Sequence, residues 1–234
     1  LQKDANFVEV LSVTSEDAST TIVQQKADGV PLSTVLFGDT DPGSKAATFA
    51  VQGAESILLS LTGTGAGAGE RIDSIKLSRT DRFAIALDLC AALARCHDAS
   101  PPVVLGGLRS ENVLVNANQD SRAARIIWPS VTYLLGVVGS GNGLHMAPEL
   151  DDNAPPTSKA DIWSLGMLLL EIFTQERAWA EQTRAQVQML IKHGERPSLA
   201  KLPAGFARLV TDCLATEPAA RPDVSRVTAR LKEL

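Results

Sequence analysis

The segment DIWSLGMLLLEIFT at residues 161–174 constrains the fold of this chain more than any other feature. Apolar residues fall on nearly every face of the helix that this segment would form, whereas a surface helix carries them along one stripe. Its most apolar part, Met167 to Phe173, is too short to span a bilayer, which takes about 20 apolar residues. The segment therefore predicts a helix buried at the centre of a globular domain.

Length, charge and cysteine usage narrow the class of protein. The chain has 234 residues, of which 44% are hydrophobic, so it can bury one sizeable core or two small ones. Its formal net charge is −5 and its basic residues are scattered, so we expect no nucleic-acid and no membrane partner. Three cysteines without a CxxC pair favour neither disulfides nor zinc, and predict a reducing compartment, the cytoplasm. The chain starts at Leu1 without a signal pattern, which suggests a fragment or a processed chain.

The first third of the chain contains few helix signals. β-Branched residues at 7–14 and 20–24, separated by a polar stretch, predict a β-hairpin. A short helical pattern begins at Leu32. From about 38 to 77 the chain is rich in glycine, alanine, serine and threonine, which predicts an insertion or a long mobile loop with a candidate strand at 56–61.

The rest of the chain carries helical periodicity. Thr80 is the expected cap of a helix whose apolar stripe continues to about Asp98. Amphipathic patterns predict further helices at about 183–193, 204–215 and 222–233, the last with Pro222 in its first turn.

Four motifs in this helical part resemble those of protein kinases, in the same order and at about the same spacing. VVLGGLRSENVLV at 103–115 resembles the catalytic loop, whose family pattern is H-R-D-L-x-x-x-N. HMAPEL at 145–150 is similar to the A-P-E motif, and DIWSLG at 161–166 to the D-x-W-S-x-G start of the central helix. EPAARP at 217–222 contains the arginine that pairs with the A-P-E glutamate in that family. The sequences LRSENVLV and HGERPSL are most similar to the corresponding segments of the tyrosine-kinase-like group.

This resemblance implies a fold that is α+β, mainly α: a protein-kinase-like C-terminal lobe with a small antiparallel sheet remaining from the N-terminal lobe. Residues 1–27 would supply strands four and five and the hinge, and 28–234 the helical lobe, with the Gly/Ala/Ser-rich insertion at about 38–77. The phosphate loop and the strand-three lysine would then precede residue 1. An alternative alignment extends the N-terminal lobe over 1–61, although no V-A-x-K match occurs there.

The resemblance also assigns residues to the two catalytic motifs: Leu105, Gly106 and Gly107 to H-R-D, and Trp128, Pro129 and Ser130 to D-F-G. In the family the first aspartate orients the substrate hydroxyl and the second holds magnesium. Gly107 and Trp128 carry no carboxylate for either task. The resemblance therefore implies a pseudokinase, and we expect no enzymatic activity, no bound metal and no cofactor.

Three residues remain as vestigial candidates for contact with a nucleotide. The alignment makes Gln24 the gatekeeper and Gln25 the first hinge residue, and Asn112 matches the metal-binding asparagine of the catalytic loop. An asparagine after a turn more often caps local backbone, so a capping role is the favoured interpretation of Asn112. The sequence GTGAGAG at 63–69 lacks the spacing of a phosphate-binding loop and is interpreted as a flexible linker.

Four further positions match family residues that hold the lobe together. Glu149 and Arg221 are expected to form a buried ion pair. Asp161 is expected to accept hydrogen bonds from the backbone of the catalytic loop, and Trp163 to pack beneath Pro148. The motifs that match are thus structural, whereas the degenerate ones touch nucleotide and substrate in the family.

Two functions follow as expectations from this contrast. The favoured one is a scaffold or allosteric module that binds other proteins, whose identity stays open. The alternative is an atypical kinase-like, ATP-dependent transferase that uses non-standard residues such as Asn112 and Glu111.

Overall fold

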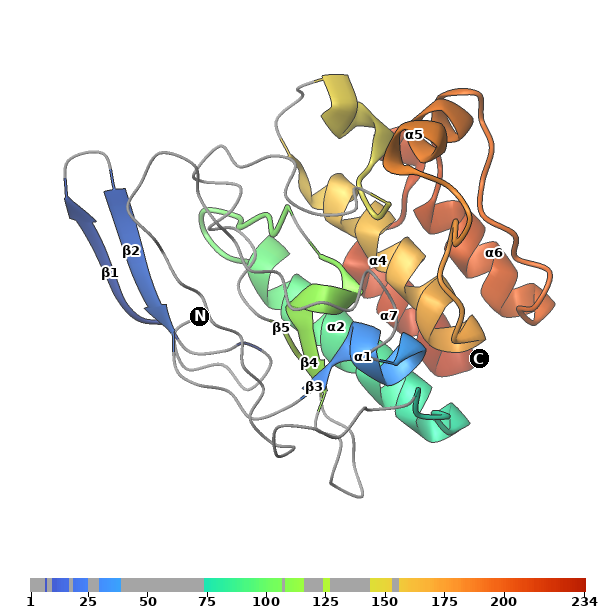
Figure 1. Cartoon of the computed structure of the whole chain (residues 1–234), viewed down its shortest axis with the longest axis horizontal. Helices are drawn as coiled ribbons and strands as arrows, with labels where there is room; N and C mark the ends of the chain where they lie inside the picture. The colour runs from blue at the N-terminus through green and yellow to red at the C-terminus, as the bar shows by residue number, and fades with distance from the viewer. Residues whose placement is uncertain are drawn as a thin grey trace.

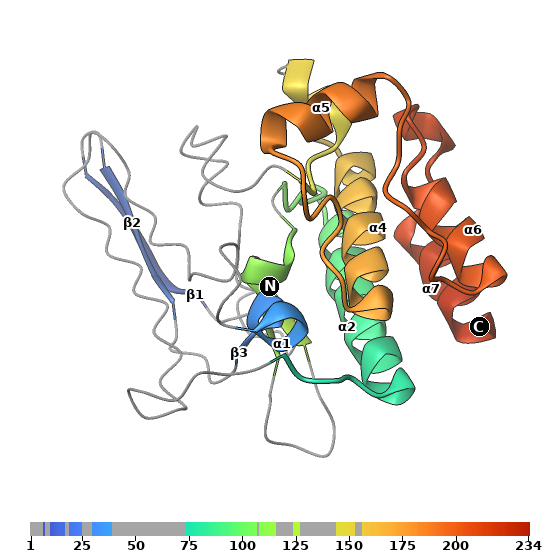
Figure 2. The same cartoon turned by 45° about the vertical axis from the view of Figure 1, so that its right-hand side comes forward.

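The structure is a computed structural model, shown in two orientations in Figures 1 and 2. It describes residues 7, 10–16, 19–24, 30–38, 74–106, 108–115, 124–126, 144–152 and 156–234. Statements below refer to these residues.

A body of packed helices forms most of the described structure, and α4 runs through its middle (Figure 1). α4 contacts α2 and α6, and α7 contacts the same two helices. Every residue of α4 from Ala160 to Ile172 is buried, which confirms the predicted central helix. The four helices are α2 (Arg79–His97), α4 (Ser158–Thr174), α6 (Ala204–Cys213) and α7 (Val224–Glu233).

The flanking residues decide where α4 begins and ends. The Thr157 hydroxyl accepts a hydrogen bond from the Ala160 N–H, so the helix begins at Ser158, before the apolar run. Gln175 ends the helix in the left-handed conformation, with φ 54°. The Gln175 side chain accepts a hydrogen bond from Leu77 N (3.1 Å) and donates one to Ile75 O (2.7 Å). The segment that leads into α2 is therefore fastened to the end of α4.

Close contacts between helices explain why they pack as one body. An added Cβ at Gly166 would lie 2.7 Å from Cys213 Cβ, so α4 and α6 approach more closely than any side chain at this position would allow. At the other end of α4, the ring of Phe173 lies 4.9 Å from that of Phe83 in α2 and 3.9 Å from that of Phe206 in α6. These contacts join three helices at two levels.

The remaining helical elements are shorter than α2 and α4. They are α1 (Leu32–Phe37), the 3-10 helix η1 (Ser110–Asn112), η2 (Pro148–Asp152), α5 (Arg184–Lys192) and η3 (Pro218–Ala220). Figure 2 shows α5 across the end of α4, beside η2, and α5 and η2 are in contact.

The strands form two small antiparallel sheets. β1 (Val10–Glu16) pairs with β2 (Ser19–Gln24) as the predicted hairpin, although its first strand starts and ends later than expected. β4 (Val113–Val115) pairs with β3 (Val30–Pro31) on one side and β5 (Ala124–Ile126) on the other. The hairpin lies apart from α4, α6 and α7 in both views (Figures 1 and 2). A mainly helical fold with a small antiparallel sheet is thus confirmed.

Two expected helix starts are wrong. Ser78, not Thr80, caps α2: its hydroxyl accepts from the Asp81 N–H, and the Asp81 carboxylate accepts from the Ser78 N–H. Pro222 is not in the first turn of α7, because Asp223 is still extended (φ −80°, ψ 159°) and the helix begins at Val224.

Some expectations concern residues that the structure does not describe. The candidate strand at 56–61 and nearly all of the 38–77 insertion lie outside the described residues, and the division at residues 27 and 28 stays a prediction. In the part of the chain that the structure describes, no helix combines the length and the apolar character needed to cross a membrane.

Candidate functional site

Hydrogen bonds to Asp161 of α4 hold the segment that resembles a catalytic loop. The Asp161 carboxylate accepts hydrogen bonds from Leu105 N (2.9 Å) and Gly106 N (2.8 Å). His97 at the end of α2 lies 2.9 Å from the same carboxylate through its Nε2. Asp161 is 1% exposed, so the carboxylate that fixes the loop backbone is itself shielded from water.

The conformation of this loop depends on a glycine. Gly106 has φ 67°, a left-handed conformation in which a Cβ would crowd the following carbonyl. Leu105 beside it is fully buried. Asn112, at the end of η1, is 6% exposed, and its backbone N–H donates to Arg109 O (3.0 Å). Among the described residues of this loop, Asn112 is therefore an inner rather than a surface side chain.

The end of the A-P-E-like segment is joined to the late helices by Arg221. Its guanidinium donates to both carboxylate oxygens of Glu149, at 2.7 Å each. Arg221 is fully buried, and its guanidinium also donates to the carbonyl oxygens of Ala215, Lys159 and Thr216. A bidentate pair of this kind fixes the orientation of both side chains.

Trp163 is the buried centre of the same region. Its indole is 0% exposed, and two guanidinium groups lie over the ring, with Arg221 Cζ 5.1 Å and Arg196 Cζ 4.9 Å from its centroid. Arg196 also donates to Leu214 O (2.7 Å) and to Thr216 Oγ1 (2.6 Å). Burial and the nearby positive charge of Arg221 lower the pKa of Arg196. The cation–π contacts and hydrogen bonds together tie the end of α6 to α4.

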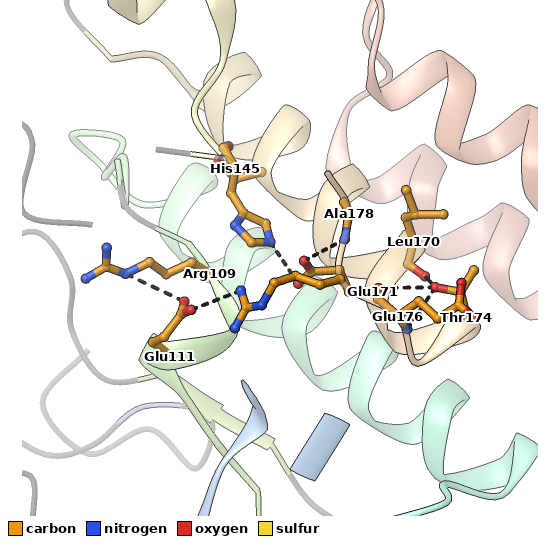
Figure 3. Close-up of polar contacts among 10 residues, drawn as sticks. Arg109, Glu111, His145, Leu170, Glu171, Thr174, Glu176 and Ala178 are labelled. Atoms are coloured by element: carbon orange, nitrogen blue, oxygen red, sulfur yellow. Dashed lines mark hydrogen bonds and ion pairs between the residues drawn. The ribbon is translucent and has the colours of Figure 1, made fainter. Parts of the chain in front are cut away.

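A second group of charged residues lies where η1 faces the loop after α4. Glu111 pairs with Arg177 (Oε1 to Nη1, 3.5 Å) and with Arg109 (Oε2 to Nε, 4.0 Å), as Figure 3 shows for Glu111 and Arg109. The guanidinium of Arg177 lies over the Phe37 ring at 4.5 Å. Burial lowers the pKa of Arg109, while the charge of Glu111 opposes that shift.

Close to this group is an ion pair that sequence reasoning missed. His145 Nε2 lies 2.9 Å from Glu171 Oε2, and Ala178 N donates to Glu171 Oε1 at 3.2 Å (Figure 3). Burial lowers the pKa of His145, but the charge of Glu171 and its hydrogen bond raise it more, so the pKa lies above the usual value. The sequence alone favours a packed or solvent-facing histidine at this position. The available signal for the pair is Glu171, a charged residue in a nearly all-apolar helix.

Several candidate positions are not described. Gly107, Trp128, Pro129, Ser130 and Gln25 lie outside the described residues, and of Gln24 only the backbone, at the end of β2, is described. Within the described ranges, no group of three or more histidine, cysteine, aspartate or glutamate residues could hold a metal ion. In the described part of the catalytic loop, the residues with oxygen ligands of the kind that bind magnesium include Asn112 and Glu111, and Glu111 is paired with Arg177 and Arg109.

Comparison with known proteins covers almost the whole chain. Residues 1–231 match the family described as protein tyrosine and serine/threonine kinase. "Probable serine/threonine-protein kinase SIS8" of Arabidopsis thaliana is 29% identical over 166 residues, which is 68% of this chain and 16% of that protein.

Two other relatives show the same pattern. "Serine/threonine-protein kinase CTR1" of Arabidopsis thaliana is 27% identical over 177 residues, covering 72% of this chain and 20% of that protein. "Probable serine/threonine-protein kinase roco9" of Dictyostelium discoideum is 29% identical over 160 residues, covering 65% of this chain and 5% of that protein. The chain thus spans between 5% and 20% of the length of these three relatives.

These comparisons correct one expectation. The sequence predicts that the chain is no enzyme, because Gly107 and Trp128 occupy the positions of two aspartates. The relatives are named serine/threonine-protein kinases, which is an enzyme class, so that expectation is contradicted. Two missing side chains in one alignment do not suffice to place a chain in a non-enzymatic class.

Proposed function

The chain belongs to the protein tyrosine and serine/threonine kinase family, and from that membership we propose that its helical lobe is a protein-binding module with a scaffold or allosteric role. One observation carries the proposal: two of the contacts expected to hold the lobe together are formed. Arg221 donates to the Glu149 carboxylate, and the Asp161 carboxylate accepts from the backbone of the loop. Such contacts preserve a rigid surface, and a preorganised surface loses less entropy when it binds a protein.

Two finer assignments accompany this proposal. The wording LRSENVLV and HGERPSL supports membership of the tyrosine-kinase-like group. Cys90, Cys96 and Cys213 are buried thiols, which supports a reducing compartment, and we place the domain in the cytoplasm.

Binding can be tested before the partner is identified. A photo-reactive amino acid at exposed Met189 of α5 would capture the bound protein, and titration calorimetry with the purified partner would then measure affinity. Asn112→Ala is expected to leave this affinity unchanged, because binding by the lobe does not use a metal ligand. Failure of the purified proteins to form a stoichiometric complex would contradict the binding function.

A second function is favoured by the names of the relatives: transfer of phosphate from ATP to serine or threonine of a protein. In this chain Asn112 would be the metal-binding candidate, and Arg109, in the same loop, carries the positive charge nearest in sequence. Phosphoryl transfer relies mainly on positioning and charge stabilisation, so these groups would have to act with a metal ion and with residues outside the described ranges.

A transfer assay distinguishes the two functions. Labelled ATP with magnesium or manganese would be incubated with the chain and protein substrates, and Asn112→Ala compared with Asn116→Ala, an asparagine outside the motif. Transfer that Asn112→Ala abolishes and Asn116→Ala preserves would favour the enzyme. Partner binding without transfer would favour the module.

A further inference from the structure

The stretch between His145 and Glu149 is attached to the helical body at two points. At Glu149 the attachment is the bidentate pair with Arg221. At His145 it is the 2.9 Å contact of the ring with Glu171 on α4. The backbone adds a further contact there, because the Ser164 hydroxyl donates to His145 O at 2.8 Å. Of the side chains in the two ion pairs, histidine alone has an ordinary pKa within the physiological range.

We propose that His145 and Glu171 form a protonation-controlled latch that holds the start of η2 against α4. With a proton on the ring, both partners are charged and the pair is complete. When the ring loses that proton, Glu171 keeps only a neutral partner in a site closed to water. The attachment at His145 then weakens while the one at Glu149 remains.

Burial gives the latch its strength. Glu171 is 0% exposed and His145 7%. A buried carboxylate is costly unless it is paired, since water cannot solvate it. Its second oxygen is already used by Ala178 N, so His145 supplies the compensating charge. The proton on the ring therefore affects the stability of the whole turn rather than one surface contact.

The charged groups that act on the ring come from three parts of the chain, and Figure 3 shows the two carboxylates, Glu171 and Glu111. Glu171 of α4 and Glu111 of η1 favour the protonated ring, and Arg177 in the loop after α4 opposes it. Arg177 is itself paired with Glu111. Burial lowers the pKa of His145, these carboxylates raise it more, and the pKa lies above its ordinary value.

The direction of the effect follows from linkage. A folded-state pKa above that of the unfolded chain contributes stability that is complete below the unfolded pKa. That stability is lost as the pH rises through the folded pKa. The latch is thus closed under mildly acidic conditions and opens as the pH rises. Because η2 contacts α5, opening is expected to alter the packing of η2 against α5.

The first test uses the unmodified 234-residue chain. Histidine ring signals followed by NMR between about pH 5 and 9, a range that brackets the ordinary histidine pKa, are assigned through His97→Gln and His193→Gln. Hydrogen-exchange protection factors of residues 144–150 are measured over the same range. We expect His145 to titrate above the ordinary histidine pKa and protection to fall as His145 deprotonates. A His145 ring that titrates at or below the usual value would overturn the proposal.

Two variants make the test specific. His145→Gln can still donate a hydrogen bond to Glu171 but cannot titrate, so the pH dependence of protection at 144–150 should disappear. Glu171→Gln keeps the shape and an acceptor for Ala178 N, and should lower the His145 pKa. His193→Gln is the matched control and should keep the full pH dependence. A His145→Gln profile that still follows the wild type would refute the latch.

Neither measurement requires a partner, a nucleotide or turnover. If Glu171→Gln does not fold, the titration of the unmodified chain still shows whether His145 has a raised pKa and whether protection of residues 144–150 follows it. The outcome is therefore separate from that of the proposed function.

Discussion

Arg221 shows at the scale of one residue how a buried charge is tolerated. It is 1% exposed, yet its three nitrogens all donate to protein acceptors, and two of these acceptors belong to one carboxylate. Hydrogen bonding by all three nitrogens offsets much of the loss of water around the guanidinium. The residue thus joins the A-P-E-like segment, η3 and α4 through one side chain.

Removal of Arg221 should therefore be severe. Arg221→Ala leaves Glu149 without its bidentate partner. Breaking a fully buried pair costs about 3–5 kcal/mol, and because the Glu149 side chain is 19% exposed we expect a loss toward the lower end of that range. Urea unfolding followed by circular dichroism would measure the loss. Arg230→Ala is the matched control, because its pair with Asp212 is exposed and should contribute less than about 1 kcal/mol. Similar unfolding midpoints for the two variants would contradict the role given to Arg221.

Gly106 is the second position where a single residue decides local structure. Since its φ is 67°, Gly106→Ala should destabilise the chain by about 1–2 kcal/mol, through crowding of the new Cβ. Gly106→Asn should cost less, because asparagine tolerates the left-handed conformation. Thermal denaturation of the three proteins would check the order. An alanine variant as stable as the wild type would show that the loop can adopt another conformation.

At the scale of the element, α2 begins where a reciprocal pair of hydrogen bonds forms. Ser78 Oγ and Asp81 satisfy each other's backbone N–H groups, which would otherwise be left without partners at the helix start. The helix also ends against the rest of the fold, because His97 in its last turn contacts Asp161. Both ends of α2 are thus defined by specific side chains.

Ser78→Ala should therefore shorten or weaken α2. Loss of a serine cap costs about 1 kcal/mol, and we expect that decrease in the free energy of unfolding. Thr80→Ala is the control: Thr80 is an exposed residue inside the first turn, and its replacement should change stability little. Chemical denaturation of both variants distinguishes them. A larger effect of Thr80→Ala would restore Thr80 as the cap.

The helical body behaves as one unit at the scale of the whole molecule, because its core is shared by helices distant in sequence. α7 packs against both α2 and α6, and Cys90 of α2 and Cys213 of α6 are both fully buried. Burial raises the pKa of both thiols to about 12. A thiolate at either position thus requires the separation of α2, α6 and α7.

Thiol reactivity should consequently report global unfolding. At about pH 8, below the ordinary thiol pKa, the native chain should react only slowly with a thiol-specific reagent, because the reactive thiolate is scarce and covered. Labelling should become fast for all three cysteines across the urea transition measured by circular dichroism. Stoichiometric labelling of Cys90 or Cys213 in native buffer, found by peptide mass spectrometry, would contradict a single cooperative body.

Several elements of the fold could be predicted from the sequence, because their formation depends on local patterns. The buried α4 follows from apolar residues on every face, and the hairpin from two β-branched stretches around a polar one. The cap of α2 is also visible in principle, because Ser78 and Asp81 have the spacing of a capping box, although Thr80 lies closer to the apolar stripe and competes for the role. For such features, residues close in the chain carry the necessary information.

Only the tertiary structure decided the rest, because the interacting residues are far apart in the chain. His145 and Glu171 are separated by 26 residues, and Glu111 and Arg177 by 66, and no spacing rule brings either pair together. Motif resemblance could name Glu149 and Arg221 but not the carbonyl oxygens that also accept from Arg221. Burial, which sets the balance of effects on the His145 pKa, exists only once α4, η1 and the following loop have packed around the ring.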